Sequence, residues 1–403
     1  MDKTATILIV DDEPYNVDYL EQELEDLGYD TVSAFNGREA LEQVAAESPD
    51  VILLDITMPV MNGFEALAHL KVDKETRDIP VIVISAMDDM DSVVRGIELG
   101  AEDYLPKPFD PVLLHARIRS SLERKWLRDQ EQLYLQGLER ELEIGRHIQA
   151  EFLPSELPQP EGWEIAAFFE AARQVSGDFY DAFILARDGK IGLLVGDVSD
   201  KGVGAALYMT LFRTLLRVAA SRDEFGIWQN TETTATGSAE IDRGRTLKNA
   251  ITVTNSYVVE NHGQSSMFAT IFFGVLDPAT GSLLYVNGGH EPPVILNAGE
   301  VKEDLPRTGP VVGILPDTSF TVGETQLEPG DTLLIFTDGV TEAQDARGEL
   351  LGRERLLELL RQPGKGSIPL PDRIAAAVLE YIGDAKQFDD ITIVAVQRNS
   401  KSN

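Results

Sequence analysis

Cysteine is absent from the 403 residues of the sequence. Without a thiol the chain can form no disulfide, no thiolate nucleophile and no zinc site built on cysteine ligands. Basic residues are scarce as well, since 35 lysines and arginines face 68 aspartates and glutamates, for a formal net charge of −33. Nucleic acids and anionic membranes are bound by clustered lysine and arginine. We therefore expect neither as a partner.

Targeting segments are also missing. The N-terminus enters a predicted strand at once, with no basic stretch before an apolar core, so no signal peptide is expected. No uninterrupted apolar run approaches membrane-spanning length. An apolar content of 43% is typical of a globular protein, and the length favours two or three domains. These features predict a cytoplasmic protein.

Short apolar runs that each end in an acidic or hydroxyl residue mark the first part of the chain. They are residues 6–10 before Asp11 and Asp12, residues 51–54 before Asp55, and residues 81–84 before Ser85. Segments with helical periodicity lie between the runs. This alternation predicts a doubly wound parallel α/β sheet, and the residues at the carboxyl ends of its strands should converge at one edge.

Three carboxylates in one pocket repel one another unless a cation shares them. Mg²⁺ suits such a pocket because it prefers a few carboxylates together with phosphate. Lys107 supplies a positive charge for a phosphoryl oxygen. Pro108 makes the bond that follows Lys107 a candidate for the cis form.

These features resemble the receiver domain of two-component response regulators. The matching pieces are Asp11-Asp12, Asp55 followed by Met58-Pro59 and Asn62-Gly63, Ser85-Ala86, and Lys107-Pro108. The resemblance implies a five-stranded receiver over residues 1–118, in which Asp55 accepts a phosphoryl group from a histidine kinase or phosphotransfer protein. It also implies a Mg²⁺ site formed by Asp11, Asp12, Asp55 and Thr57. The switch residues that it implies are Ser85, Tyr104 and Lys107.

Residues 119–155 predict a helical linker between two domains. Its apolar residues recur at spacings of three, four or seven and form one stripe. They are Leu127, Tyr134, Leu138, Leu142, Gly145, Ile148 and Phe152. The stripe fits either an ordinary helix packed on one domain or a coiled-coil-like helix that pairs two copies of the chain. We favour the homodimer, because the helix bridges two domains and has no other obvious cover.

In residues 160–397 strands dominate and helices come in separate runs, which predicts an α+β sandwich with flanking helices. The expected strands are 164–169, 192–195, 269–275, 282–286, 293–296, 332–336 and 391–396. The expected helices are 205–221, 247–260, 353–361 and 374–382. Residues 222–245 are polar, rich in threonine and without periodicity, so we expect a surface loop there.

Aspartates at strand ends recur in this second part of the chain. Asp178, Asp197, Asp338 and Asp389 each lie beside a glycine, a threonine or a second aspartate. With no cysteine and no His-x-x-His spacing, oxygen ligands for Mg²⁺ or Mn²⁺ are the natural choice. Two such ions bridged by an aspartate can lower the pKa of a shared water and hold a substrate phosphate. The pattern predicts hydrolysis of phosphate esters.

Several stretches of this part resemble PP2C-like, metal-dependent serine phosphatases of the SpoIIE and RsbU type, which act in bacterial stress and sporulation pathways. They are residues 175–181, 196–202, 267–270, 285–293, 336–343 and 389–392, and residues 141–154 resemble the segment that precedes this catalytic domain. The resemblance implies phosphoserine or phosphothreonine on a protein as substrate, typically an anti-sigma-factor antagonist of the STAS type. It implies two Mn²⁺ or Mg²⁺ ions as cofactors.

The roles of single residues follow from the same resemblance. Asp197 would bridge the two ions with help from the Val198 carbonyl, and Asp338 and Asp389 would ligate from their loops. Asp178 would contact an ion or its water, with Asp390 nearby. The chain departs from the family pattern at two positions, with Ser176 where glycine is usual and Ala171 near a usual proline.

Two residues fit more than one role. Arg173 fits a contact to the substrate phosphate or a surface salt bridge, and the salt bridge is the more frequent arrangement. His290 fits a proton donor to the leaving serine or a structural histidine in a Gly-Pro turn, and the second is again more frequent.

Together the two halves predict a response regulator whose output is a protein phosphatase, controlled by phosphorylation of Asp55. No helix-turn-helix pattern or basic patch follows Asp110, which argues against a DNA-binding output. The alternative is a non-catalytic switch that binds a partner through a degenerate phosphatase fold, supported by Ser176. A nucleotide cyclase fits poorly, because the strand-end acids lack a basic cradle for a triphosphate.

Overall fold

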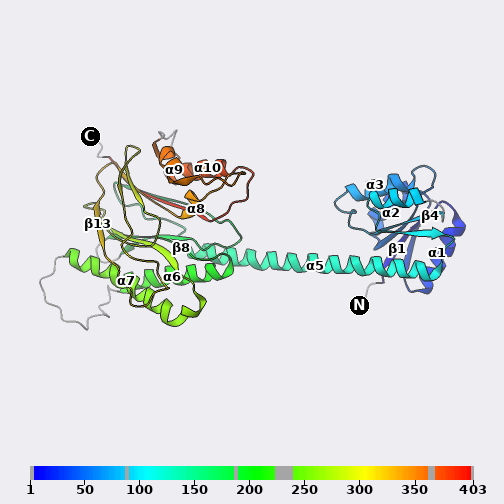
Figure 1. The fold of residues 1–403 in the computed structure, drawn as a ribbon, viewed down its shortest axis with the longest axis horizontal. Coiled ribbons are helices and arrows are strands. Elements are labelled where there is room, and N and C mark those ends of the chain that lie inside the picture. The colour runs from blue at the N-terminus through cyan, green and yellow to red at the C-terminus, as the bar shows by residue number, and fades with distance from the viewer. Residues whose placement is uncertain (1–3, 87–89, 186–188, 223–238, 362–367, 401–403) are drawn as a thin grey trace. The chain divides into compact units, whose positions relative to one another are not determined.

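The computed structural model describes residues 4–86, 90–185, 189–222, 239–361 and 368–400. The chain divides into two compact units, Met1–Glu139 and Arg140–Asn403. One long helix, α5 (Pro111–Phe152), begins in the first unit and ends in the second (Figure 1). Because α5 runs without a break through the predicted linker, the domain limits 1–118, 119–155 and 160–397 remain predictions.

The first unit is a parallel five-stranded sheet with the strand order β2-β1-β3-β4-β5, which confirms the predicted doubly wound fold. The strands are β1 (Thr6–Val10), β2 (Asp30–Ala34), β3 (Val51–Asp55), β4 (Val81–Ala86) and β5 (Asp103–Lys107). The helices are α1 (Pro14–Asp26), α2 (Gly37–Glu47), α3 (Gly63–Val72), α4 (Met90–Glu98) and the start of α5.

The central strands are apolar without interruption because helices cover both faces of the sheet. All five residues of β3 are buried. One core packs β1 and β3 against α2 and α3, and a second packs their opposite faces against α1 and α5, where Leu114 and Ile118 are buried. Asparagine side chains cap the N-termini of α2 and α3. Asn36 accepts hydrogen bonds from the first turn of α2, and Asn62 forms a capping box with Glu65 at α3.

The second unit contains two antiparallel five-stranded sheets with the orders β13-β10-β9-β8-β7 and β12-β11-β14-β15-β6. The strands of the first sheet are β7 (Phe179–Leu185), β8 (Lys190–Val198), β9 (Ala269–Leu276), β10 (Ser282–Gly288) and β13 (Gly323–Gln326). Those of the second are β6 (Trp163–Glu170), β11 (Val294–Asn297), β12 (Glu300–Asp304), β14 (Asp331–Phe336) and β15 (Ile391–Arg398). The helices are α6 (Val203–Arg222), α7 (Ala239–His262), α8 (Asp338–Thr341), α9 (Gly352–Arg361) and α10 (Leu370–Ile382).

Three cores hold these layers together. Leu193 and Leu333 pack in the core between the sheets. Their neighbours Leu194 and Leu334 point the opposite way, into the cores under the helices. Helices α6 and α7 cover one sheet and α9 and α10 cover the other (Figure 1). The unit is therefore a helix–sheet–sheet–helix sandwich, as the sequence predicts.

Helix α6 is the one helix in the described part of the chain that is long and apolar enough to cross a membrane, by length and composition alone. The expectation concerned uninterrupted apolar runs, and this finding does not contradict it, because the apolar run of α6 contains charged residues. Its apolar residues at helical spacing, such as Met209, Phe212 and Leu216, are buried in the core of the second unit. Arg213 and Arg217 interrupt the run and pair with the buried Asp181 on β7. One face of α6 thus packs in the core, while Val203, Leu207 and Val218 are exposed.

The strands β7, β12 and β13 were not expected. Strand β7 carries the buried Asp181 amid apolar residues, which disguises its pattern, and the other two are short, largely exposed strands. The expected loop over residues 222–245 is wrong at its end, because α7 already begins at Ala239. Residues 223–238 of that interval lie outside the described residues.

Truncation of Phe272, fully buried between the two sheets, should destabilise the second unit. We expect Phe272→Ala to lower the free energy of unfolding by about 3–5 kcal/mol, because the cavity adds to the lost burial. Urea unfolding of the full chain, followed by tryptophan fluorescence, measures this value. Ile184→Ala, at an exposed position of β7, is the control and should stay within about 0.5 kcal/mol. Equal losses in the two variants would contradict the described core.

Candidate functional site

The receiver acids meet at the carboxyl edge of the parallel sheet. Carboxylate oxygens of Asp11, Asp12 and Asp55 lie within 4.8 Å of one another. The Nζ of Lys107 lies 2.8 Å from Asp11 Oδ2 and 2.9 Å from Asp55 Oδ1. Asn16 donates to both oxygens of Asp11, at 3.1 Å each. The side chains expected from three different strands thus lie in one site.

Burial and charge oppose each other at this edge. Burial raises the pKa of Asp55, and the charges of Asp11 and Asp12 raise it further, while the bond to Lys107 lowers it. Burial alone would lower the pKa of Lys107, but its bonds to Asp11 and Asp55 outweigh burial and raise it. Three oxygen donors under mutual repulsion fit a divalent cation with oxygen preference such as Mg²⁺.

The backbone around Asp55 depends on a glycine. A Cβ added to Gly63, the first residue of α3, would lie 2.2 Å from the carbonyl oxygen of Asp55. The chain therefore needs glycine there to bring α3 against the end of β3. Thr57 is exposed beside Asp55, and the peptide bond between Lys107 and Pro108 is cis.

The expected switch residues lie on β4, the strand beside β3, and on β5, which pairs with β4. Ser85 is buried near the end of β4 and pairs in register with Pro106 of β5. Tyr104 lies on β5, with the guanidinium of Arg117 5.5 Å from its ring centre. Arg117 also forms an ion pair with Asp103 at 2.8 Å. This contact ties Tyr104 to the first turns of α5, and the sequence reasoning did not include Arg117.

The second set of acids comes from both sheets of the sandwich. Asp178 precedes β7, Asp197 lies near the end of β8, Asp338 begins α8 directly after β14, and Asp389 precedes β15. The charges of Asp338 and Asp389 both act on Asp197. The fold therefore brings together acids that are far apart in the sequence.

The electrostatics of this cluster show that it is under strain from like charges. Burial, then repulsion by Asp338 and Asp389, raises the pKa of Asp197 to about 8. Burial, then repulsion led by Asp389, raises the pKa of Asp338 to about 6. Burial and the charge of Asp197 raise the pKa of Asp178 well above its usual range. Such carboxylates can stay ionised at neutral pH when cations neutralise them.

The spacing of the acids differs between the two sites. Among the residues that the structure describes, the one group of three acids within 4.8 Å is that of the receiver. No three of the described acids around Asp197 lie this close together. Two ions about 3.5–4 Å apart need such a wider set. The all-oxygen donors and the raised pKa values fit two Mg²⁺ or Mn²⁺ ions.

Two threonines orient Asp178. Thr337 and Thr392 donate to its Oδ2 at 2.7 and 2.6 Å. Asp178 is almost fully buried, so its carboxylate is held in one orientation. The threonines were not predicted as site residues, although they lie inside the stretches 336–343 and 389–392 that resemble the family.

Asp390 has a different environment from its neighbour Asp389. Its Oδ2 accepts hydrogen bonds from the hydroxyl of Ser176 at 2.6 Å and from the N–H of Gly177 at 3.0 Å. Its Oδ1 accepts from the N–H of Ala172 at 2.7 Å. Both oxygens are therefore used to hold the loop before Asp178. The hydroxyl of Ser176 in turn accepts from the N–H of Asp178 at 2.9 Å.

The last turn of α5 also holds this loop. The side-chain amide of Gln149 donates to the Ser176 carbonyl at 2.7 Å and accepts from the Ser176 N–H at 3.0 Å. Gln149 is buried, unlike most of α5. Sequence reasoning missed it, although a glutamine beside Gly145, Ile148 and Phe152 on the apolar stripe was the available signal.

A second glycine sets the distance between the loops of Asp338 and Asp389. A Cβ on Gly339 would lie 1.9 Å from the carbonyl oxygen of Asp390. Only glycine allows the first turn of α8 to approach β15 this closely. The Asp-Gly pair of the sequence thus places Asp338 next to Asp389.

The remaining candidate residues lie in unlike surroundings. His290 is buried, its Nδ1 lies 2.9 Å from Thr270 Oγ1, and burial lowers its pKa to about 3. A neutral, buried imidazole favours the structural alternative for His290. Arg173 is exposed and forms no ion pair with any residue that the structure describes, so the expected salt bridge is wrong within that part of the chain. Val198 is buried at the end of β8.

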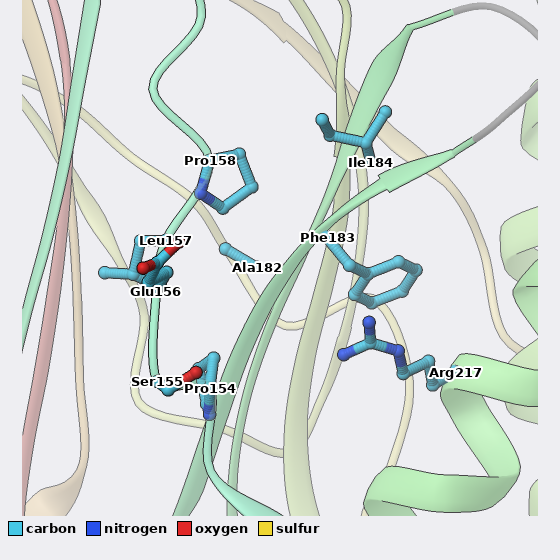
Figure 2. A pocket seen from close by; sticks show the side chains of 9 residues that line it. All are labelled: Pro154, Ser155, Glu156, Leu157, Pro158, Ala182, Phe183, Ile184 and Arg217. Atoms are coloured by element: carbon cyan, nitrogen blue, oxygen red, sulfur yellow. The ribbon is translucent and has the colours of Figure 1, made fainter.

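A separate pocket of about 420 Å³ opens on the other half of β7 (Figure 2). Residues 154–158, which follow α5, form one wall, and Phe183 with Arg217 forms the other. The guanidinium of Arg217 lies 4.8 Å from the ring centre of Phe183. None of the four acids lines this pocket.

Comparisons with known proteins agree with both units. Residues 187–399 match the family model of Stage II sporulation protein E (SpoIIE), and residues 7–119 match that of the response regulator receiver domain. The SiaA-PP2C domain of Pseudomonas aeruginosa superposes with a TM-score of 0.51 at 22% identity, over 66% of this chain and 98% of that domain. At this identity the likeness shows the fold alone.

Two curated relatives match parts of the chain. Protein IcfG of Synechocystis sp. is 45% identical over 264 residues, which are 64% of this chain and 42% of IcfG. Response regulator PleD of Caulobacter vibrioides is 44% identical over 127 residues, which are 32% of this chain and 28% of PleD. The chain thus spans less than half the length of each relative.

The acids around Asp197 should make stability depend on pH. Their folded pKa values lie above those of the unfolded chain, so the folded protein binds more protons and loses stability as pH rises from about 4 to 8. Mn²⁺ binds the deprotonated carboxylates and should therefore raise the melting temperature more at pH 8 than at pH 6.

Thermal unfolding in EDTA and in MnCl₂ at the two pH values measures this difference. The Asp197→Asn variant shows which site is responsible, because it leaves the receiver acids unchanged. It should lose most of the pH-dependent rise in melting temperature that Mn²⁺ causes. An equal gain at both pH values in the unmodified chain would contradict the described electrostatics.

Proposed function

Because the chain belongs to the SpoIIE family of PP2C-type domains and carries a response-regulator receiver domain, we propose that it is a receiver-controlled, metal-dependent protein phosphatase. Its substrate is phosphoserine or phosphothreonine on a protein. The observation that carries the proposal is the partly buried, mutually repelling cluster of Asp178, Asp197, Asp338 and Asp389. A carboxylate cluster of this kind has no structural use without cations.

Each acid has a proposed task. Asp197 lies between the others and would be shared by two ions with the Val198 carbonyl, while Asp338 and Asp389 would each hold one ion. Asp178, fixed by two threonines, would orient Asp197 or a bound water. Two Mn²⁺ or Mg²⁺ ions in this position supply an activated water and a clamp for phosphoryl oxygens. Arg173 is exposed and free to contact the substrate phosphate.

The substrate class is proposed from the resemblance of the second unit to stress and sporulation phosphatases. A STAS-type anti-sigma-factor antagonist that carries phosphoserine is the first candidate. The alternative of a degenerate binding protein rests on Ser176, but this residue helps to hold the acids in place. Its hydroxyl bonds both Asp390 and the N–H of Asp178. A serine that positions an acid favours the enzyme over the non-catalytic switch.

The receiver would act through Asp55. A histidine kinase or phosphotransfer protein would phosphorylate it, with Asp11, Asp12, Asp55 and Thr57 holding Mg²⁺. Ser85, Tyr104 and Lys107 would then respond to the phosphoryl group. Nothing in the acidic surface favours nucleic acid, and a cytoplasmic location suits both a kinase and a phosphoprotein partner.

Helix α5 would carry the signal between the units and pair two copies of the chain. Leu127, Tyr134, Leu138 and Ile148 of its apolar stripe are exposed, and a second copy of the same helix would cover them. At the end of α5, Gln149 holds the backbone of Ser176. A rotation of the paired helices would therefore move the loop that carries Asp178.

Loss of one proposed ligand should abolish turnover. We expect Asp338→Asn to lower Mn²⁺-dependent hydrolysis of p-nitrophenyl phosphate by at least about 100-fold, the usual scale for removing a group that stabilises the transition state. Asp317→Asn, at an exposed loop position, is the matched control and should keep the full rate. A normal rate in Asp338→Asn would sink the proposed active site.

The coupling predicts a second result. Beryllofluoride, a mimic of the phosphoryl group, should change the phosphatase rate of the unmodified chain, and Asp55→Ala should remove this response. Gln149→Ala should also uncouple the two units, because it removes the two bonds to Ser176. Gln136→Ala, at an exposed position of the same helix, should respond normally. Equal rates with and without beryllofluoride in the unmodified chain would refute control by the receiver.

A further inference from the structure

Lys201 reaches into the acidic cluster from the turn after β8. Its Nζ lies 2.8 Å from Asp389 Oδ2 and donates to the Phe388 carbonyl at 2.7 Å. The same ammonium lies 4.3 Å from the ring centre of Phe388. Three contacts of different kinds thus hold one cation against an acid that we propose as a metal ligand.

The local backbone prepares this position. Asp200 adopts φ 73°, in the left-handed region that is uncommon for residues other than glycine. Its Oδ1 accepts a hydrogen bond from the N–H of Lys201 at 2.8 Å. The turn therefore directs the chain at Lys201 back toward β15, which lies in the other sheet.

Both oxygens of Asp389 are already engaged in this arrangement. Oδ1 accepts from the N–H of Asp390 at 2.9 Å, and Oδ2 faces Lys201. A metal ion bound at Oδ2 would lie close to the Lys201 ammonium and be repelled by its charge. The bond to the main chain is fixed by the turn, whereas the lysine side chain is 27% exposed and can move into solvent.

We propose that Lys201 is a tethered counter-ion that occupies Asp389 in the metal-free protein and is displaced when a divalent cation binds. The inference rests on the proposed two-metal site and adds a positioning residue to it. Metal binding then breaks the bond between Lys201 and Asp389 and places two cations near each other. Removal of the ammonium should therefore strengthen metal binding. A lysine that merely braces the loop would have the opposite effect.

The test measures Mn²⁺ binding to the full chain by isothermal titration calorimetry. All proteins carry Asp12→Asn to weaken the receiver site. We expect Lys201→Gln to bind Mn²⁺ about three- to tenfold more tightly, the range that loss of one partly exposed ion pair allows. Lys201→Arg keeps the cation and should stay within about twofold of the parent.

Two controls isolate the contact. Lys302→Gln removes a lysine from Asp331, at the opposite end of β14 from Asp338, and should leave Mn²⁺ affinity unchanged. In an Asp389→Asn background, Lys201→Gln should no longer tighten binding, because no carboxylate is left to compete for.

The possible outcomes distinguish failure of the role of Lys201 from failure of the proposed function. Equal or weaker Mn²⁺ binding by Lys201→Gln, with normal binding by the parent, would overturn the role of Lys201 alone. Absence of any Mn²⁺ binding that depends on Asp197 in the parent would overturn the proposed function and this inference together.

Discussion

Repulsion between buried carboxylates is the constraint on which both halves of this molecule depend. Asp178, Asp197 and Asp338 have raised pKa values because burial removes the water that would otherwise stabilise their charge. Strands from two antiparallel sheets bring these acids together. Two threonine hydroxyls fix Asp178, and Gly339 lies where no side chain would fit. The repulsion between these acids lowers the stability of the fold, and bound cations would relieve it.

The two units meet this demand differently. In the receiver, Lys107 contacts two of the three acids, so a resident cation already offsets part of the repulsion around Asp55. In the second unit, Lys201 contacts Asp389 at the rim, while Asp197 at the centre depends on ions from solution. The receiver site is therefore partly neutralised by the chain itself. The second site is poised between a repelling and a neutralised state.

The sequence predicts those features that depend on the pattern of neighbouring residues. Buried strands that end in aspartate led to Asp11, Asp55, Asp197 and Asp338, and the shared edge of parallel strands explains why Asp11 and Asp55 meet. It does not predict contacts made between distant segments. The buried Asp181 hid β7 because two arginines from α6 neutralise it, and no local pattern announces that pairing. The bonds of Ser176 to Asp390 and Gln149 likewise join segments that only the folded sandwich brings together.

These contacts define how a signal from α5 could reach the acids. Gln149 makes two hydrogen bonds to the backbone of Ser176, and each is worth about 0.5–1.5 kcal/mol net. Their sum is close to the coupling energy of about 1–3 kcal/mol that is usual between linked sites. A stronger attachment would lock the loop of Asp178 in one position, and a weaker one would not transmit a movement of the helix. Because the acids repel one another, a small shift of Asp178 changes the field at Asp197 directly. In the proposed coupling, these two hydrogen bonds would pass a movement of α5 to the loop that carries Asp178.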